Sequence, residues 1–224
     1  MARDNISGIC RGRPCAYPIP RAATRAAPTG MRRPRLGRVA KHRRSLRLRE
    51  YDYSRAGAYF VTVCAEGRGC FFGQVSDGRI ELNDAGCMID SCWNQLRERS
   101  PNLDLDQFVV MPNHIHGIVV ILGEQSLGAQ SGAQAVTLGS IVGAFKSITT
   151  DNYVNGVESK DWTRFDGRLW QRNYYEHVIR DAEQLGRIRE YIDGNPGSWA
   201  TDEENPDGAT HSARQRQTIW DAPK

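Results

Sequence analysis

The sequence predicts an α+β fold: an antiparallel β-sheet with helices mainly on one face. Three observations indicate this class. Short segments rich in β-branched and aromatic residues indicate strands, and the Ser76-Asp77-Gly78 turn joins two of them into an antiparallel hairpin. Other segments repeat apolar residues every three or four positions, as amphipathic helices do. The expected order of strand, hairpin, helix, two strands, helix, strand and helix differs from that of a doubly wound parallel sheet.

The expected strands share high β-propensity and are bounded by turn-forming residues. They are residues 58–65, 70–75, 79–82, 105–111, 114–122 and 169–174. The segment 114–122 (HIHGIVVIL) is mostly apolar, which favours a central position in the sheet. The segment 169–174 is expected at an edge. Residues 123–135, rich in small side chains, are expected to form a mobile loop.

Three amphipathic helices follow from apolar residues spaced by three and four. Asn83 can cap the first, which is expected within residues 84–96. The second is marked by apolar residues in 138–148, and the last runs over residues 182–194, after which Pro196 disfavours helical geometry.

Charge is distributed unevenly along the chain. Residues 1–50 carry 14 Lys and Arg against 2 Asp and Glu, a net charge of +12, which leaves −8 for the remainder. Residues 1–45 have few large apolar side chains, so a basic, disordered arm is expected there, with translation from Met31 as an alternative start. Such an arm would attract phosphates without sequence preference. One domain is expected over residues 46–206, followed by a tail over residues 207–224.

Composition argues against several classes of protein. No apolar run approaches the roughly 18 residues of a membrane-spanning helix, and the N-terminus lacks the apolar stretch of a secretory signal. The six cysteines form no CxxC pair and no Cys/His cluster with the spacing of a zinc site. A cytoplasmic protein without a membrane partner is therefore expected.

The sharpest motif is MPNHIH, which begins at Met111. Side chains alternate along a strand, so His114 and His116 project from one face while Ile115 points to the other. Two imidazoles side by side on a rigid strand form half of a metal site. Taken alone, the pattern is also typical of histidines that pack or form hydrogen bonds within a sheet.

A second motif, EYIDGNP, lies on the last expected helix. Ile188 and Ile192 belong to the buried stripe of this helix. Tyr191 and Asn195, four residues apart, lie in register along its flank, which would present a phenol and an amide oxygen together. The alternative is that Tyr191 packs against the core and Asn195 caps the helix.

Three motifs in this order, MPNHIHG, WQRNYYEHVIR and EYIDGNP, resemble those of the REP-associated tyrosine transposases, a single-tyrosine branch of the HUH superfamily. The resemblance covers residues 44–206. It implies a ferredoxin-like, RRM-like HUH transposase fold whose central strand carries the histidines. In that family two histidines and a polar residue four positions after the tyrosine bind a divalent cation. The ligand positions correspond here to His114, His116 and Asn195, and the nucleophile corresponds to Tyr191.

The resemblance implies transesterification of single-stranded or hairpin DNA, such as repetitive palindromes. Tyr191 would become linked to the 5′ phosphate while a 3′ hydroxyl leaves, and a later hydroxyl attack would rejoin the strand. A phenol with a pKa of about 10 is protonated at neutral pH, so a cation that neutralises phosphate oxygens is needed. Two imidazoles and an amide oxygen suit Mg²⁺ or Mn²⁺. The protein would act as a monomer or a homodimer.

Three other functions fit parts of the pattern. The same fold would recognise hairpin DNA without cutting it. A metallohydrolase would hold zinc at the histidines, which requires a further carboxylate or histidine ligand. A replication initiator or plasmid relaxase would share the chemistry of two histidines and a tyrosine.

Several neighbouring side chains are weaker candidates for DNA contacts or chemistry. Contacts to phosphates or stacking on bases would involve Lys146, Ser147, Trp170, Gln171, Arg172, Tyr174 and Tyr175. A solvated face or core packing is the alternative for each of them. For His177, a structural role is favoured over that of a general base.

Overall fold

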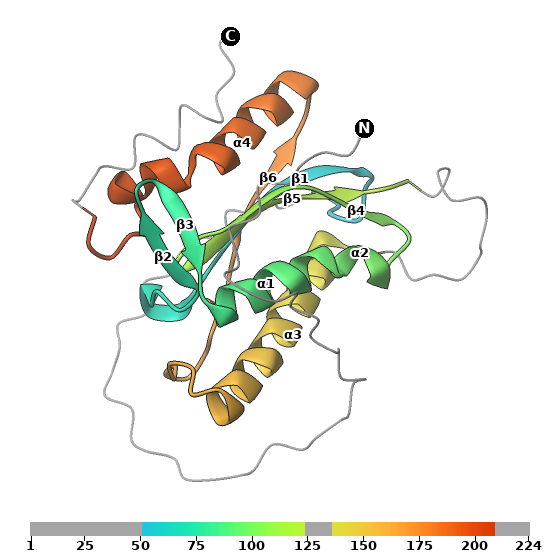
Figure 1. Cartoon of the computed structure of the whole chain (residues 1–224). Helices are drawn as coiled ribbons and strands as arrows, with labels where there is room; N and C mark the ends of the chain where they lie inside the picture. The colour runs from blue at the N-terminus through green and yellow to red at the C-terminus, as the bar shows by residue number, and fades with distance from the viewer. Residues whose placement is uncertain (1–50, 124–135, 209–224) are drawn as a thin grey trace, which may run out of the picture.

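The computed structural model describes residues 51–123 and 136–208 (Figure 1). The expected basic arm, almost all of the small-residue loop and most of the expected tail lie outside the described residues. Among the helices of these two ranges, none is both long and apolar enough to cross a membrane.

Four antiparallel strands form the main sheet, in the order β4-β5-β1-β6. Their bounds are Gly57–Cys64 for β1, Leu103–Val110 for β4, His114–Ile121 for β5 and Tyr175–Ile179 for β6. A short 3-10 turn (η1, Glu66–Arg68) and a separate hairpin of β2 (Gly73–Ser76) and β3 (Arg79–Leu82) follow β1. Apart from this insertion, the order is the βαββαβ pattern of the ferredoxin-like fold. The predicted α+β class and the central position of β5 are confirmed.

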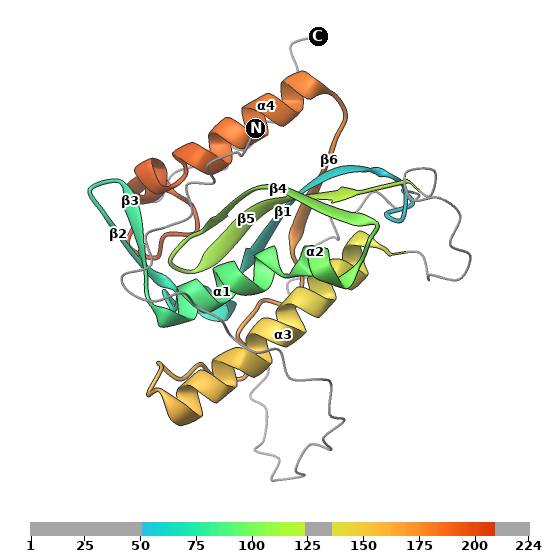
Figure 2. The same cartoon turned by 45° about the vertical axis from the view of Figure 1, so that its right-hand side comes forward.

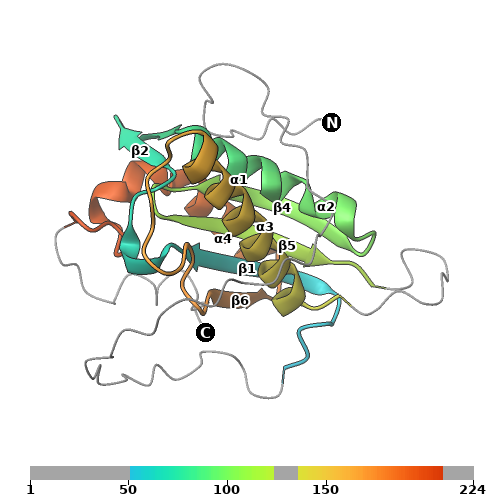
Figure 3. The same ribbon diagram turned by 90° about the horizontal axis from the view of Figure 1, so that it is seen from below.

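The helices divide between the two faces of this sheet (Figure 2). Their bounds are Asp84–Asn94 for α1, Leu96–Arg99 for α2, Leu138–Ser159 for α3 and Ala182–Gly194 for α4, and a 3-10 helix, η3 (Pro196–Thr201), follows α4. One face is covered by α1, α2 and α3, and the view from below shows α1 and α3 crossing it together (Figure 3). Of the helices in the described residues, α4 covers the opposite face, and η3 follows it there. The expectation of helices mainly on one face therefore holds for α1 to α3, with α4 as the exception.

Side-chain caps fix where the helices begin. The Asn83 side chain accepts a hydrogen bond from the Gly86 amide, as the sequence predicted. Thr137 and Ser140 form a reciprocal capping box at the start of α3. The side chain of Asp181 accepts from the Gln184 amide at the start of α4. The observed bounds of α4 match the predicted ones.

The face covered by three helices holds the larger core. Trp93 of α1 stacks on Phe108 of β4 with ring centroids 4.5 Å apart, and Phe145 of α3 meets Trp93 edge-on at 5.5 Å. The backbone of β5 passes directly beneath this group. A Cβ at Gly117 would lie 2.4 Å from the Trp93 ring, so only glycine fits there.

The face covered by α4 holds a smaller apolar cluster. Phe60 of β1 and Ile118 of β5 pack there against Ile188 and Ile192, the predicted buried stripe of α4. All four side chains are almost completely buried. This cluster holds the EYIDGNP motif against the strand that carries the histidines.

The predicted edge strand at residues 169–174 is wrong, because the strand is β6, which begins at Tyr175. Trp170 forms only an isolated bridge with Ala65 and is buried in the core. The Lys146 ammonium donates hydrogen bonds to the backbone carbonyls of residues 171–173. The Gln171 amide donates to the Cys64 carbonyl at 2.9 Å, so this segment meets the end of β1 at an isolated bridge without forming a regular strand.

Candidate active site

Buried polar side chains interrupt the apolar face beneath α4. Each of them is at most 8% exposed; they are Thr62, Asn113, His114, His116 and Asn195. Burying a polar group costs about 1–3 kcal/mol unless a hydrogen bond compensates it. Five buried polar side chains on one face therefore indicate a candidate functional site.

The His114 ring is held in one tautomer by Asn113. The Asn113 amide nitrogen donates to the backbone carbonyls of Arg68 and Glu204, at 3.1 and 2.6 Å. Its oxygen must therefore accept from His114 Nδ1, 2.8 Å away. Because Nδ1 carries the proton, the lone pair of His114 Nε2 is available to a metal ion.

The His116 ring is oriented in the same way by a strand neighbour. Its Nδ1 lies 2.8 Å from the Thr62 hydroxyl on β1, which can accept the Nδ1 proton. The two Nε2 atoms of His114 and His116 are then 3.0 Å apart and face each other. The prediction that both histidines project from one face is confirmed, and Ile115 belongs to the opposite core.

Tyr191 lies beside this pair, on α4. Its hydroxyl is 3.4 Å from His116 Nε2, and the two ring centroids are 5.2 Å apart. Phe60 packs against both rings, with centroids 5.4 Å from His116 and 6.0 Å from Tyr191. The motifs on β5 and α4, 75 residues apart in the sequence, therefore meet in one site.

Asn195, the predicted third ligand, is 3% exposed at the C-terminal end of α4. Its side-chain oxygen is buried and accepts no hydrogen bond from the described residues. An unsatisfied buried amide oxygen is costly, and coordination to a cation would satisfy it.

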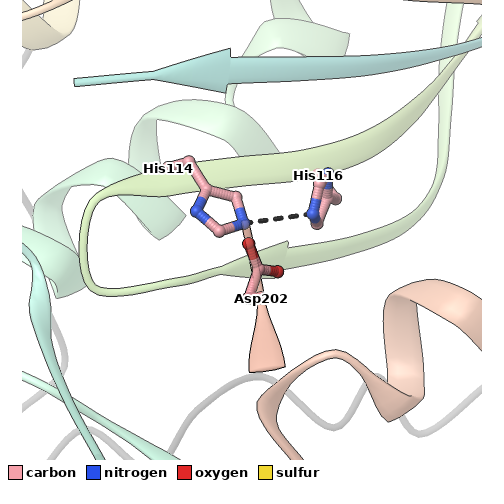
Figure 4. A group of neighbouring side chains, drawn as sticks. All are labelled: His114, His116 and Asp202. Atoms are coloured by element: carbon pink, nitrogen blue, oxygen red, sulfur yellow. Dashed lines mark hydrogen bonds between the residues drawn. The ribbon is translucent and has the colours of Figure 1, made fainter. Parts of the chain in front are cut away.

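Asp202 was missed by sequence reasoning. It follows η3, and its carboxylate and the imidazoles of His114 and His116 each offer one ligand atom, all within 4.8 Å of one another (Figure 4). Its Oδ1 also accepts a hydrogen bond from the Glu204 amide at 2.7 Å. No spacing rule in the sequence connects an aspartate eleven residues after Tyr191 to histidines on a distant strand. The turn through η3 brings it there.

Among known proteins, the chain is 39% identical over 176 residues to an uncharacterized protein of Haemophilus influenzae (strain ATCC 51907 / DSM 11121 / KW20 / Rd). The match covers 72% of this chain and 92% of that protein. The chain belongs to the family of this Haemophilus protein. No protein-family model matches the chain.

Two solved structures are similar to this chain. The REP-associated tyrosine transposase bound to a REP hairpin has 19% identity and a TM-score of 0.45, covering 65% of this chain and 70% of its own. A candidate transposase of Deinococcus radiodurans has 19% identity and a TM-score of 0.34, covering 65% and 93%.

Three of the side chains that the sequence offered as weaker candidates for DNA contacts or chemistry form bonds within the fold. Lys146 binds the carbonyls of residues 171–173, and Trp170 donates to the Thr149 hydroxyl inside the core. His177 forms a hydrogen bond with the Gln184 side chain at 2.8 Å, which agrees with the structural role favoured for it.

Proposed function

We propose that this protein is a single-tyrosine transposase that nicks and rejoins single-stranded or hairpin DNA. The observation that carries the proposal is the Tyr191 hydroxyl 3.4 Å from His116 Nε2, beside two imidazole nitrogens that face one point. A nucleophile within reach of a cation site is the arrangement that phosphodiester transesterification requires. The three motifs shared with REP-associated tyrosine transposases support the same assignment.

The donor set fits a divalent cation that would be held by His114, His116 and Asn195, with Asp202 as a further ligand. The Nε2 atoms of the two histidines lie 3.0 Å apart and face each other, so both could bind one ion. The mixture of imidazole nitrogens with amide and carboxylate oxygens is compatible with Mg²⁺ or Mn²⁺. The unsatisfied Asn195 oxygen supports a bound cation as well.

When bound, such a cation would neutralise the non-bridging phosphate oxygens and orient the target phosphate. Tyr191 Oη would then form a bond to phosphorus as the bond from phosphorus to the 3′ oxygen breaks. The phenol loses its proton, and the leaving 3′ oxygen gains one. A later 3′ hydroxyl would reverse the exchange and release Tyr191. One ester replaces another in each step, so no nucleotide triphosphate is required.

One chain would supply the complete site. Tyr191 on α4 and the histidines on β5 belong to the same molecule and contact each other directly. The proposed enzyme is therefore complete as a monomer, and a homodimer would not need to exchange the tyrosine helix.

A zinc-dependent hydrolase is the second candidate, because Asp202 provides the carboxylate ligand that such a site needs. Two histidines and one carboxylate are a known catalytic zinc set. In that case the cleaving group would be a water molecule and Tyr191 would be dispensable.

Formation of a covalent DNA adduct tests the proposal. The purified full chain is incubated with 5′- and 3′-labelled hairpin oligonucleotides, including repeats that flank its gene, in Mg²⁺ or Mn²⁺. Tyr191→Phe and His114→Ala are the test variants. Val154→Ala, at an exposed site on α3, is the matched control.

The proposal predicts an adduct that survives denaturant in the wild-type protein and in Val154→Ala, and that is absent from both test variants. Cleavage that persists in Tyr191→Phe without any adduct would favour the hydrolase. Tight hairpin binding without cleavage across the panel would instead indicate a binding protein.

A further inference from the structure

Strand β4 departs from regular pairing opposite the centre of α4. Leu105 pairs with Val119 and Phe108 pairs with Gly117, so one extra residue of β4 lies between these pairs. This is a β-bulge, in which two consecutive residues oppose one on the neighbouring strand. The bulged residues are Asp106 and Gln107.

The bulge changes which side chains of β4 face α4. Leu103 and Leu105 pack in the core on the far face, and so do Phe108 and Val110. The alternation is therefore shifted by one residue between the two pairs. A bulge is a local device that re-aims side chains, and here both bulged residues reach α4.

Both contacts grip one flank of the tyrosine helix. Arg189 donates from Nε to Asp106 Oδ1 at 2.8 Å and from its terminal nitrogen to Asp106 Oδ2, which makes a two-point ion pair. Gln107 donates to Asp193 Oδ1 at 2.7 Å. The hydrogen bonds to Asp106 also raise the pKa of Arg189 above its ordinary value.

The gripped flank lies opposite the nucleophile. Residues on a helix turn by about 100° each, so Arg189 and Asp193 share one flank and Tyr191, two positions from either, lies roughly 200° around the axis. The apolar contacts of Ile188 and Ile192 are non-directional, so by themselves they do not fix the rotation of α4 about its axis. A two-point ion pair is directional and resists that rotation.

We infer that Asp106 and Gln107, with Arg189, form a clamp that positions Tyr191 by fixing the rotation of α4. This inference rests on the proposed function, because positioning matters only if Tyr191 is the nucleophile. These three are positioning residues, since they would act through the placement of α4 and not on the reacting atoms themselves. Misplacing a reacting group by about 1 Å costs on the order of 10²-fold in rate.

The clamp is tested with Asp106→Ala, Arg189→Lys and Gln107→Ala. Arg187→Ala is the matched control, because it breaks the Arg187–Glu183 ion pair, which lies on the same helix but does not reach the sheet. The readouts are the single-turnover rate of adduct formation at saturating hairpin DNA, the Kd for DNA and the melting temperature.

The expected rate falls about 10- to 100-fold for Asp106→Ala, less for Arg189→Lys and about threefold for Gln107→Ala, with the DNA Kd within threefold of wild type. Arg187→Ala is expected to react at the wild-type rate. Wild-type rates in Asp106→Ala and Gln107→Ala, or rate losses equal to the unfolded fraction, would overturn the clamp.

The outcomes separate this inference from the proposed function. If the wild-type protein forms a Tyr191 adduct and the clamp variants form it equally fast, only the clamp fails. If no adduct forms at all, the proposed function fails. Hydrogen exchange then tests whether the clamp holds α4. The clamp then predicts faster amide exchange in α4 for Asp106→Ala than for Arg187→Ala, and equal exchange would overturn it.

Discussion

The two faces of the main sheet differ in what they contain. The face beneath α1 to α3 is a mainly apolar core in which Trp93, Phe108 and Phe145 pack ring against ring. Its buried polar residues Thr149 and Asn152 bond within that core. The face beneath α4 combines a small apolar cluster with buried imidazoles, amides and a hydroxyl. Alternate residues of a single strand, β5, serve the two faces.

This difference indicates a division of labour. Burial of large aromatic side chains is the main source of stability in a small domain. Buried polar groups cost stability and are retained where they act. The three-helix face should therefore determine whether the chain folds, and the α4 face whether it reacts. Four predictions follow from this division.

Chelation of divalent cations should have the largest effect, and only on chemistry. Removing the cation should lower the rate of adduct formation on the order of 10³-fold or more, because phosphate charge is then left unneutralised. The melting temperature should change little, because the apolar cores do not depend on the ion. Adduct assays and calorimetry with and without chelator check both. Unfolding on chelation would show that the ion stabilises the fold, and would contradict the division between the two faces.

Trp93→Ala should have the largest effect on stability. Truncating a fully buried tryptophan costs about 3–5 kcal/mol, because the transfer free energy of the ring is lost and a cavity is left behind. Urea unfolding, with Val154→Ala as the exposed control, measures the free energy of unfolding. The folded fraction should keep its affinity for Mn²⁺. Loss of that affinity in folded protein would show that the two faces are not independent.

Asp202→Asn should test whether Asp202 is a metal ligand beside His114, His116 and Asn195. If the carboxylate coordinates the ion, the Kd for Mn²⁺ rises about 10- to 100-fold, since a charged ligand is lost. Asn195→Ala should weaken binding as well, and by less, because a neutral amide is lost. Titration calorimetry with Mn²⁺ measures both constants. An unchanged Kd in Asp202→Asn would remove Asp202 from the site.

Most of the fold was predictable from the sequence, and so were the two motifs, on β5 and α4, that meet in the candidate site. The alternation of His114, Ile115 and His116 predicted which side chains share a face, because strand geometry is local. The C-terminal bound of α4 was predicted from Pro196. The expectation that Pro196 disfavours helical geometry before it was wrong, because Asn195 keeps helical dihedral angles and Pro196 opens η3. The length of α3 was not predictable, since its second half buries Thr149 and Asn152, and polar residues hide a helical period.

The missed features depend on contacts that are distant in the sequence. Asp202 reaches the histidines only because η3 turns the chain back across the site. Thr62 and Asn113 orient the imidazoles through pairings between strands and loops that no local pattern records. The clamp of Asp106 depends on a bulge, and a single extra residue in a strand leaves no clear trace in composition.

The smallest predicted effect is an acid sensitivity confined to the α4 face. Burial lowers the pKa of His177 below its ordinary value, and the positive charge of Arg180 lowers it further. Gln184 accepts from the Arg180 amide with its oxygen and so donates to His177 with its nitrogen. Protonated His177 would oppose that donor.

A lowered pKa in the folded state means that the neutral ring is favoured on folding. The stabilising contribution is complete above pH 6.5, the ordinary value, and is lost as the pH falls from there through the folded pKa. His177→Gln should therefore lose less stability than wild type between pH 7.5 and 5, as measured by urea unfolding at each pH. Hydrogen exchange should locate the wild-type loss in α4 and not in α1 or α3. Parallel pH profiles for the two proteins would contradict this origin, because every other titratable group is the same in both.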